Sequence, residues 1–224
     1  LADRHWDGDV ERTRTRPLVT GEATVTQARI LFVLLCLAAF GLVLLTNTLT
    51  ILLSVGGLLL ASTYPFMKRF TYWPQIVLGA AFSWAIPMAF AALLGELPSA
   101  LWLLYIANLL WTMVFDTQYA MVDRDDDLRV GIKSTAILFG EADRPVLAAM
   151  QLLCLLALVL AGQRFGLGGI YYLSLVAVAL LFGYHQYLIR SRDRDACFRA
   201  FRHNNWVGLV IFMGIALHYA FNGS

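Results

Sequence analysis

One apolar segment, LWLLYIANLLWTMVF (residues 101–115), runs directly into the acidic segment DTQYAMVDRDDDLRVGIKS (residues 116–134). The second segment holds five aspartates within twelve residues, from Asp116 to Asp127. The first approaches the length of about 20 apolar residues that a helix needs to cross a bilayer. A carboxylate placed next to lipid costs free energy, so such a residue usually has a functional role. The junction therefore indicates a polar site at the mouth of a membrane span.

The composition of the whole chain also indicates an integral membrane protein. Of its 224 residues, 59% are hydrophobic and only 14% are charged, whereas an ordinary soluble domain is about a quarter charged. Its three cysteines lie far apart without a CxxC pair. They are expected to act as small apolar side chains, and neither a disulfide framework nor a cysteine metal site is predicted.

Seven segments are long and apolar enough to cross a membrane as helices, which satisfy their own backbone hydrogen bonds in lipid. They are residues 25–45, 48–66, 75–94, 99–116, 145–162, 168–188 and 205–221. We therefore expect an all-α fold, a polytopic transmembrane helical bundle that forms one membrane-embedded domain over residues 1–224.

Charge is divided unequally between the two sides that these spans define. If the spans alternate in direction, sixteen of the seventeen Lys and Arg residues fall on one side and Arg164 falls on the other. Fourteen of the fifteen acids sort the same way, and Glu96 is the exception. The positive-inside rule makes the charged side cytoplasmic. Because that rule does not require the acids to follow, their concentration there predicts a functional site on the cytoplasmic face.

Two pairs of aspartates four residues apart are the candidate metal ligands. On a helix, Asp116, Asp123 and Asp127 fall within about 40° of one another. Asp3 and Asp7 repeat the DxxxD spacing on the same side. Ligands that are all oxygen favour a hard cation, Mg²⁺ before Ca²⁺ or Zn²⁺, and Mg²⁺ is commonly completed by substrate phosphates. Two such pairs facing each other would suit a diphosphate.

Basic residues next to these acids are candidates to complete a diphosphate site. Lys68 and Arg69 stand at the next cytoplasmic mouth, where the alternative interpretation is an ordinary positive-inside anchor. Pro65, just before them, is expected to end or kink its helix. The chain has no GxxxxGK[ST] phosphate loop, and its four histidines show no metal-ligand spacing.

Several of these segments resemble the UbiA superfamily of membrane prenyltransferases, and most closely its bacterial 4-hydroxybenzoate branch. The resemblance covers essentially the whole chain. It is carried by DRHWDGDVERTRTRPL (3–18), YPFMKR (64–69), VLGAAFSWAIPMAFAA (77–92) and DTQYAMVDRDDDLRVGIKSTAILFG (116–140). Asp3 and Asp7 match the second and third aspartates of the family motif NDxxDxxxD. The family has nine helices, so we expect the chain to lack the first two.

The resemblance implies an activity and a set of site residues. A polyprenyl group would pass from polyprenyl diphosphate to the ring carbon ortho to the hydroxyl of 4-hydroxybenzoate, in ubiquinone biosynthesis at the bacterial inner membrane. Mg²⁺ would be held by Asp3, Asp7, Asp123 and Asp127. Diphosphate would be bound by Arg12, Tyr64, Lys68 and Lys133. The residues expected to take part in catalysis are Asp116, Lys68 and Arg69. The ring proton would go to Asp116 or to diphosphate, and Arg69 is expected to bind the benzoate carboxylate.

Other functions fit the sequence less well. A sister-branch enzyme with a menaquinone-type or haem-type acceptor would keep the same mechanism, although DTQYAMVDRDDD and GIKSTAILFG argue against it. A transporter would be expected to carry acids near the membrane midplane and an inverted repeat, and neither is evident. The expected partners are therefore polyprenyl diphosphate, 4-hydroxybenzoate and membrane lipid, without nucleic acid.

Overall fold

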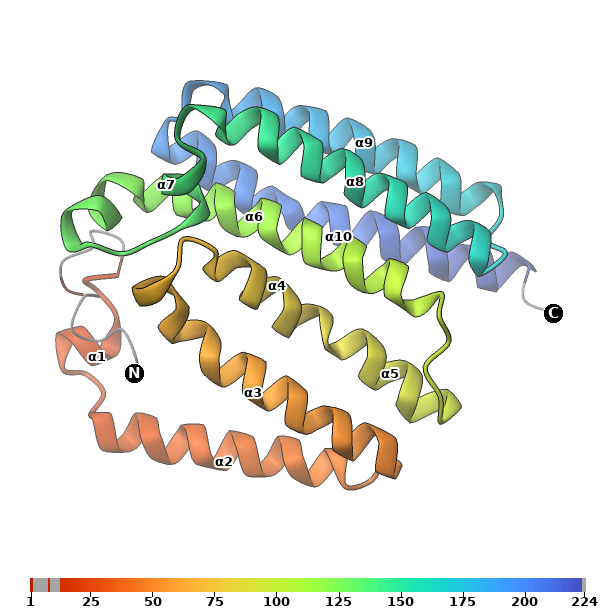
Figure 1. Ribbon diagram of the computed structural model, residues 1–224, viewed down its shortest axis with the longest axis horizontal. Helices are drawn as coiled ribbons and strands as arrows, with labels where there is room; N and C mark the ends of the chain where they lie inside the picture. Colours follow the sequence, from red (N-terminus) through yellow and green to blue (C-terminus); the bar gives the residue numbers. More distant parts are fainter. Residues whose placement is uncertain (2–7, 9–12, 223–224) are drawn as a thin grey trace.

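The structure is a computed structural model that describes residue 1, residue 8 and residues 13–222. It is all-helical in this part of the chain, as predicted (Figure 1). The α-helices are α1 (Pro17–Thr20), α2 (Val25–Val43), α3 (Thr48–Phe70), α4 (Pro74–Ser83), α5 (Ala85–Leu94), α6 (Leu101–Val130), α7 (Thr135–Phe139), α8 (Asp143–Arg164), α9 (Gly169–Leu188) and α10 (Arg194–Asn222). Two short 3₁₀ helices, η1 (Gly140–Ala142) and η2 (Ile189–Ser191), precede α8 and follow α9.

Within the described residues, six helical segments are long and apolar enough to cross a membrane. They are Val25–Val43, Thr48–Phe70, Pro74–Leu94, Thr135–Arg164, Gly169–Ser191 and Arg194–Phe221, and each overlaps most of one predicted span. The remaining predicted span, 99–116, forms the first half of α6. This helix packs against α4, α8 and α10. Because other helices cover much of its surface, its side chains need not all be apolar.

The predicted span 75–94 is divided at Trp84 into α4 and α5. Pro87 has no N–H to donate one turn back, which weakens the helix at this point. The Trp84 side chain occupies the break, and its indole N–H donates to the Leu53 carbonyl oxygen at 2.7 Å. A Cβ on Gly56 would lie 2.8 Å from the Trp84 ring. Glycine on α3 therefore makes room for the tryptophan that fills the bend.

The bundle has a well-packed half and a lipid-exposed edge. A buried apolar core joins α6, α8, α9 and α10 through residues such as Leu158, Tyr171 and Val207. At the opposite edge α2 lies beside α3 (Figure 1). The α2 helix has no buried residue among those described, and its Leu42 side chain is 69% exposed. Such an exposed apolar surface is compatible with lipid and supports a multi-pass membrane protein.

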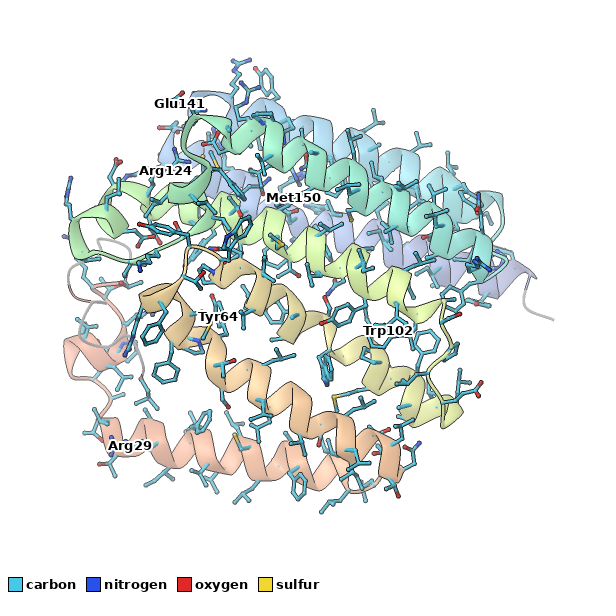
Figure 2. All side chains as sticks on the ribbon, viewed as in Figure 1. Arg29, Tyr64, Trp102, Arg124, Glu141 and Met150 are labelled. Atoms are coloured by element: carbon cyan, nitrogen blue, oxygen red, sulfur yellow. The ribbon has the colours of Figure 1, made fainter. Side chains whose placement is uncertain are left out.

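Charged residues gather at one end of the bundle, as the charge count predicted. This end comprises the C-terminal end of α6, with α7, η1 and η2 and the first turns of α8 and α10. Figure 2 shows Arg124 and Glu141 there, while Trp102 lies near the other end. The charged end thus brings together segments that are up to about 70 residues apart in the sequence, such as Asp126 and Arg194.

Candidate active site at the charged end of the bundle

The acidic pair Asp123 and Asp127 lies one helical turn apart near the end of α6. Both residues are buried, each with 8% of its surface exposed. The helix stops at Gly131, whose φ of 76° is in the left-handed region that glycine adopts without strain. Two buried carboxylates on one side of a helix repel each other, and a bound cation would relieve this cost.

The oxygen-only donor set of this pair fits a hard ion such as Mg²⁺. Among the described residues, no group of three or more His, Cys, Asp or Glu side chains could hold a metal on its own. Asp3, Asp7 and Arg12, the other predicted site residues of the first motif, lie outside the described residues. Whether Asp3 and Asp7 complete a shared metal site therefore stays a prediction.

The other acids of the segment have different surroundings. Asp126 is buried and accepts from the Arg194 guanidinium on α10 at 3.1 Å, with Arg129 at 3.6 Å. Asp125 has a side chain that is 69% exposed and lies 3.6 Å from Arg194. These two acids tie α6 to α10 rather than adding to the Asp123–Asp127 pair.

The loop that carries Lys133, just after the helix with the acidic pair, meets the end of α3 that carries Lys68 and Arg69. The Lys133 backbone N–H donates to the Lys68 carbonyl oxygen at 3.0 Å, and the Lys133 ammonium lies 3.3 Å from the Phe70 carbonyl oxygen. Tyr64, Lys68 and Arg69 all lie in the last two turns of α3. The helix continues through Pro65 to Phe70, so of the two expected effects of Pro65, an end or a kink, the helix end does not occur.

A buried hydrogen-bonded chain fixes the loop that carries Lys133. The Thr135 hydroxyl is 2.7 Å from the Thr117 hydroxyl on α6, and the Thr135 N–H donates to the Gln75 side chain on α4 at 3.1 Å. Ser134 caps α7 by accepting from the Ile137 N–H. Because these contacts join α4, α6 and α7, they fix the loop that carries Lys133 at the end of α6.

An ion-pair cluster that the sequence did not predict stabilises the same end of the bundle. Asp143, at the start of α8, is fully buried and accepts from Arg124 at 2.6 Å and from Arg192 at 2.9 Å. Arg192 has a φ of 55°, a rare left-handed conformation for a non-glycine residue. Its hydrogen bonds to Asp143 raise the pKa of Arg192 above its ordinary value. Arg124 directly follows Asp123, so the cluster anchors the acidic part of α6.

Two cavities lie along α6, on the side of the bundle between α6 and α10. The first, which we call the aromatic cavity, has a volume of about 350 Å³ and is lined by Trp111, Phe115, Phe201, Arg202, Asn204 and Asn205. Phe115 directly precedes the predicted catalytic residue Asp116, which is half-buried. No pattern in the sequence indicated this cavity, because its walls come from helices about 90 residues apart.

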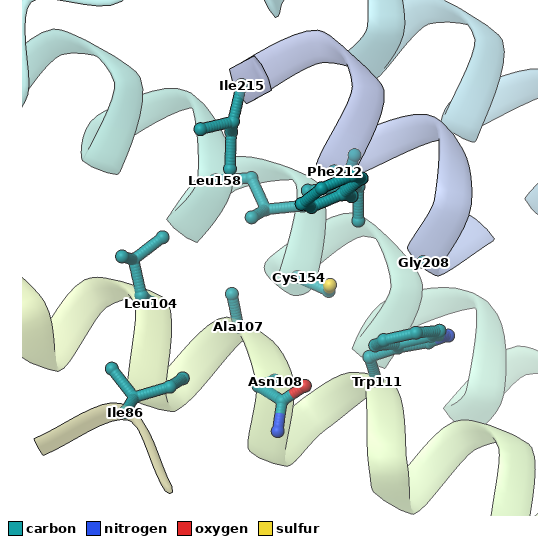
Figure 3. Close-up of a pocket in the computed structure, with 11 residues that line it drawn as sticks. Ile86, Leu104, Ala107, Asn108, Trp111, Cys154, Leu158, Gly208, Phe212 and Ile215 are labelled. Carbon is teal, nitrogen blue, oxygen red and sulfur yellow. The ribbon is translucent and has the colours of Figure 1, made fainter. Parts of the chain in front are cut away.

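The second, which we call the apolar cavity, has a volume of about 250 Å³ and is lined by the residues drawn in Figure 3. Its α6 residues, 104–111, lie farther from the charged end than Phe115 does. Leu104, Cys154, Leu158 and Phe212 line it, and Asn108 and Trp111 bring polar atoms to its wall. Trp111 is shared by the two cavities. Along α6 the order is therefore an acidic pair, an aromatic cavity and an apolar cavity.

Comparison with known proteins matches this arrangement to one family. A family model described as the UbiA prenyltransferase family matches residues 1–213. A protein of Pseudomonas syringae pv. syringae named 4-hydroxybenzoate octaprenyltransferase is 59% identical over 220 residues, which are 98% of this chain and 74% of that protein. A protein of the same name from Saccharophagus degradans is 62% identical over 215 residues, covering 96% and 72% of the two chains.

Solved structures show the same fold. A UbiA homolog from Aeropyrum pernix K1 in its apo form aligns with a TM-score of 0.85 and 29% identity, over 96% of this chain and 81% of that chain. A UbiA homolog from Archaeoglobus fulgidus bound to GPP and Mg²⁺ aligns with a TM-score of 0.67 and 21% identity, over 96% and 79%. The sequence match and the shared fold agree, and the chain belongs to the UbiA prenyltransferase family.

Proposed function

We propose that this chain carries out Mg²⁺-dependent transfer of a polyprenyl group from polyprenyl diphosphate to the carbon ortho to the hydroxyl of 4-hydroxybenzoate, releasing diphosphate, as a step of ubiquinone biosynthesis. The relatives that are 58–62% identical over nearly the whole chain, and that carry the name 4-hydroxybenzoate octaprenyltransferase, support the reaction and the acceptor. The observation that carries the mechanism is the buried Asp123–Asp127 pair at the charged end of a membrane bundle.

Charge neutralisation is the main task of the residues at the charged end. Asp123 and Asp127, together with Asp3 and Asp7, would hold Mg²⁺, which is bound with prenyl substrates in the Archaeoglobus fulgidus homolog. Bound there, the metal would offset negative charge on the departing diphosphate. In this proposal Arg12, Tyr64, Lys68 and Lys133 bind the diphosphate oxygens, and Arg69 adds positive charge at the same mouth.

The chemical step exchanges one bond for another at the allylic carbon. The bond from this carbon to the diphosphate oxygen breaks with its electron pair, and diphosphate departs. The ring carbon next to the phenol hydroxyl forms the new bond and then loses its proton. Asp116 is seven residues before Asp123, about 10 Å along the helix axis. In this proposal its half-buried carboxylate lies on the membrane side of the diphosphate site and accepts that proton.

The membrane setting follows from the two substrates. An isoprenoid tail is as apolar as lipid, whereas its diphosphate and the benzoate are charged. The apolar cavity, too small for a whole polyprenyl chain, would hold part of the tail while the rest extends into lipid. We place the protein as one membrane domain in the bacterial inner membrane, with the charged end facing the cytoplasm because the basic residues gather there.

An acceptor panel tests the proposed reaction. Membranes containing the full-length protein are incubated with labelled polyprenyl diphosphate, Mg²⁺ and one aromatic acceptor at a time. We expect prenylated product with 4-hydroxybenzoate and at least 10-fold less with a naphthoate acceptor of the menaquinone type or with haem. Product with another acceptor but not with 4-hydroxybenzoate would move the protein to a sister branch. Absence of Mg²⁺-dependent product with every acceptor would refute the prenyltransferase activity.

A further inference from the structure

The end of α9 and the facing part of α10 carry a band of exposed aromatic rings. Tyr184 and Tyr187 on α9 are 46% and 56% exposed, and Trp206 on α10 is 51% exposed. The two helices meet here: His185 Nε2 and His203 Nδ1 are 3.1 Å apart, and the Tyr184 and His203 rings lie edge to face with centroids 5.2 Å apart. Tyrosine and tryptophan are enriched where a membrane protein passes from the hydrocarbon into the headgroup region. The band therefore marks that boundary at the charged end of the bundle.

Two arginines stand just beyond the aromatic band, toward the end of the bundle. Arg190 lies in η2, and its guanidinium is over the Tyr187 ring, 4.0 Å from the centroid. Arg199 lies one helical turn before His203 on α10. Because the antiparallel helices meet at the His185–His203 pair, one turn beyond each histidine brings both arginines to a similar level. Both side chains are exposed, and neither forms an ion pair with a carboxylate of the described residues.

On the other side of the aromatic band the same two helices expose apolar side chains. Leu180 and Val176 on α9 are 72% and 57% exposed, and Leu209 and Met213 on α10 are 46% and 42% exposed. From the charged end inward, the surface thus changes from cationic to aromatic to apolar. A phospholipid has the matching order, with its phosphate outermost, its glycerol esters next and its acyl chains innermost.

The nearby acids leave this positive charge in place. Asp193 accepts from the Ala196 N–H at 3.0 Å at the start of α10. Asp195 is exposed and precedes Arg199 by one turn, so it lies farther from the aromatic band than the arginine does. An anion at the level of the band would therefore meet Arg190 and Arg199 before it meets Asp195.

We propose that this surface, the interfacial patch formed by Tyr184, Tyr187, Arg190, Arg199 and Trp206, binds an anionic phospholipid. Arg190 and Arg199 bind the phosphate, since a guanidinium can donate two parallel hydrogen bonds to it. The aromatic rings pack against the glycerol esters, and the acyl chains lie along the apolar side chains of α9 and α10. The patch contains none of the residues assigned to the reaction, so the assignment does not depend on the proposed function. It predicts that anionic lipid binds the α9–α10 hairpin at one particular place.

The test measures the binding of a charged and an uncharged lipid. Full-length protein in detergent is titrated with phosphatidylglycerol or phosphatidylcholine, and native mass spectrometry gives the Kd of the first lipid bound. The variants are Arg190→Gln, Arg199→Gln and, as the matched control, Arg202→Gln, an exposed arginine on α10 that lines the aromatic cavity instead. We expect wild type to prefer phosphatidylglycerol by about fivefold or more, and Arg190→Gln and Arg199→Gln each to weaken its binding about fivefold. Phosphatidylcholine binding, and both lipids with Arg202→Gln, should stay within about twofold of wild type.

The outcomes separate a defined site from general attraction to positive charge. Arg199→Lys keeps the charge and should retain most of the binding, and Asp195→Asn should strengthen it. An equal loss with Arg202→Gln would show general attraction and overturn the site. Equal losses of both lipids, or no preference for phosphatidylglycerol in wild type, would overturn it as well. Inorganic phosphate should compete poorly because it lacks acyl chains, and full displacement of the lipid by phosphate would reassign the patch to a soluble anion.

Discussion

At the residue scale, the neighbours of each aspartate decide its role more than its place in the motif. Asp123 and Asp127 are buried on one side of α6 beside the loop of Lys133. Asp126 is equally buried but is neutralised by Arg194, and Asp125 is largely exposed. Of these four acids, Asp123 and Asp127 form a candidate metal site, whereas Asp125 and Asp126 form ion pairs between α6 and α10.

The buried carboxylate Asp143 provides a residue-scale prediction about stability. Replacing Asp143 by Asn would remove the negative charge that Arg124 and Arg192 share, and would leave two partly buried guanidinium groups facing each other. We expect the free energy of unfolding to fall by about 2–4 kcal/mol, less than for fully buried ions because both arginines retain some solvent access. Thermal unfolding in detergent measures this change.

The matched control for Asp143 is Glu141, which also contacts Arg192. Its carboxylate lies 3.6 Å from that guanidinium but is 98% exposed, so Glu141→Gln should leave the melting temperature nearly unchanged. Similar melting temperatures for the two variants would contradict the account of the cluster.

Sequence spacing predicted the Asp123–Asp127 pair from helix geometry alone. It could not predict the role of Asp143, whose partner Arg192 lies 49 residues away.

At the scale of elements, close approach between helices depends on glycine. A Cβ on Gly79 of α4 would lie 2.9 Å from the Leu109 backbone oxygen on α6. Backbone cannot move aside as a flexible side chain can, so a larger residue here would push the two helices apart. The α4–α6 contact is important for the site because Gln75, on the same helix, holds the loop of Thr135 and Lys133.

Alanine substitutions at two helical glycines test this packing. Gly79→Ala should lower the free energy of unfolding by about 1–3 kcal/mol because of overpacking. Gly41→Ala on α2, where a Cβ would meet nothing within 4 Å, should be neutral or stabilising by up to about 1 kcal/mol through helix propensity. Both variants are compared by thermal unfolding in detergent. If Gly79→Ala proved as stable as Gly41→Ala, the α4–α6 contact would be looser than the structure shows.

Helix existence was predictable at this scale, whereas helix continuity was not. The apolar runs predicted each membrane helix because length and hydropathy are local properties of the sequence. The break at Trp84 and the uninterrupted helix through Pro65 depend on tertiary contacts. Trp84 donates a hydrogen bond to the Leu53 carbonyl oxygen and packs against glycines of α3. No local sequence pattern predicts these contacts.

At the scale of the whole molecule, the bundle is polarised, with nearly all the charged side chains of the described residues at one end. Sorting the basic residues by alternating spans predicted this arrangement, since the positive-inside rule needs only sequence positions. The relative placement of the two cavities could not be predicted, because it arises where α6, α8 and α10 meet. The order of acidic pair, aromatic cavity and apolar cavity along α6 is therefore a result of the three-dimensional packing.

Membrane orientation can be tested with one acid at each end. In a cysteine-free background, Glu96→Cys and Glu141→Cys place single thiols at exposed positions on opposite ends of the bundle. We expect a membrane-impermeant maleimide to label Glu96→Cys in intact spheroplasts and Glu141→Cys only after the membrane is opened. Labelling of both from the same side would mean that α6, which lies between them, does not cross the membrane as proposed.

The measurement that tests the central claim most directly is prenyl transfer to 4-hydroxybenzoate as Mg²⁺ is varied, in membranes containing full-length wild type, Asp123→Ala or Asp125→Ala. If Asp123 helps to hold the metal, product should require Mg²⁺, disappear with EDTA, and fall about 100-fold or more in Asp123→Ala. Asp125→Ala, which removes an exposed acid two residues away, should stay near wild type. Undiminished product in EDTA, or equal activity in the two variants, would contradict the paired-carboxylate mechanism.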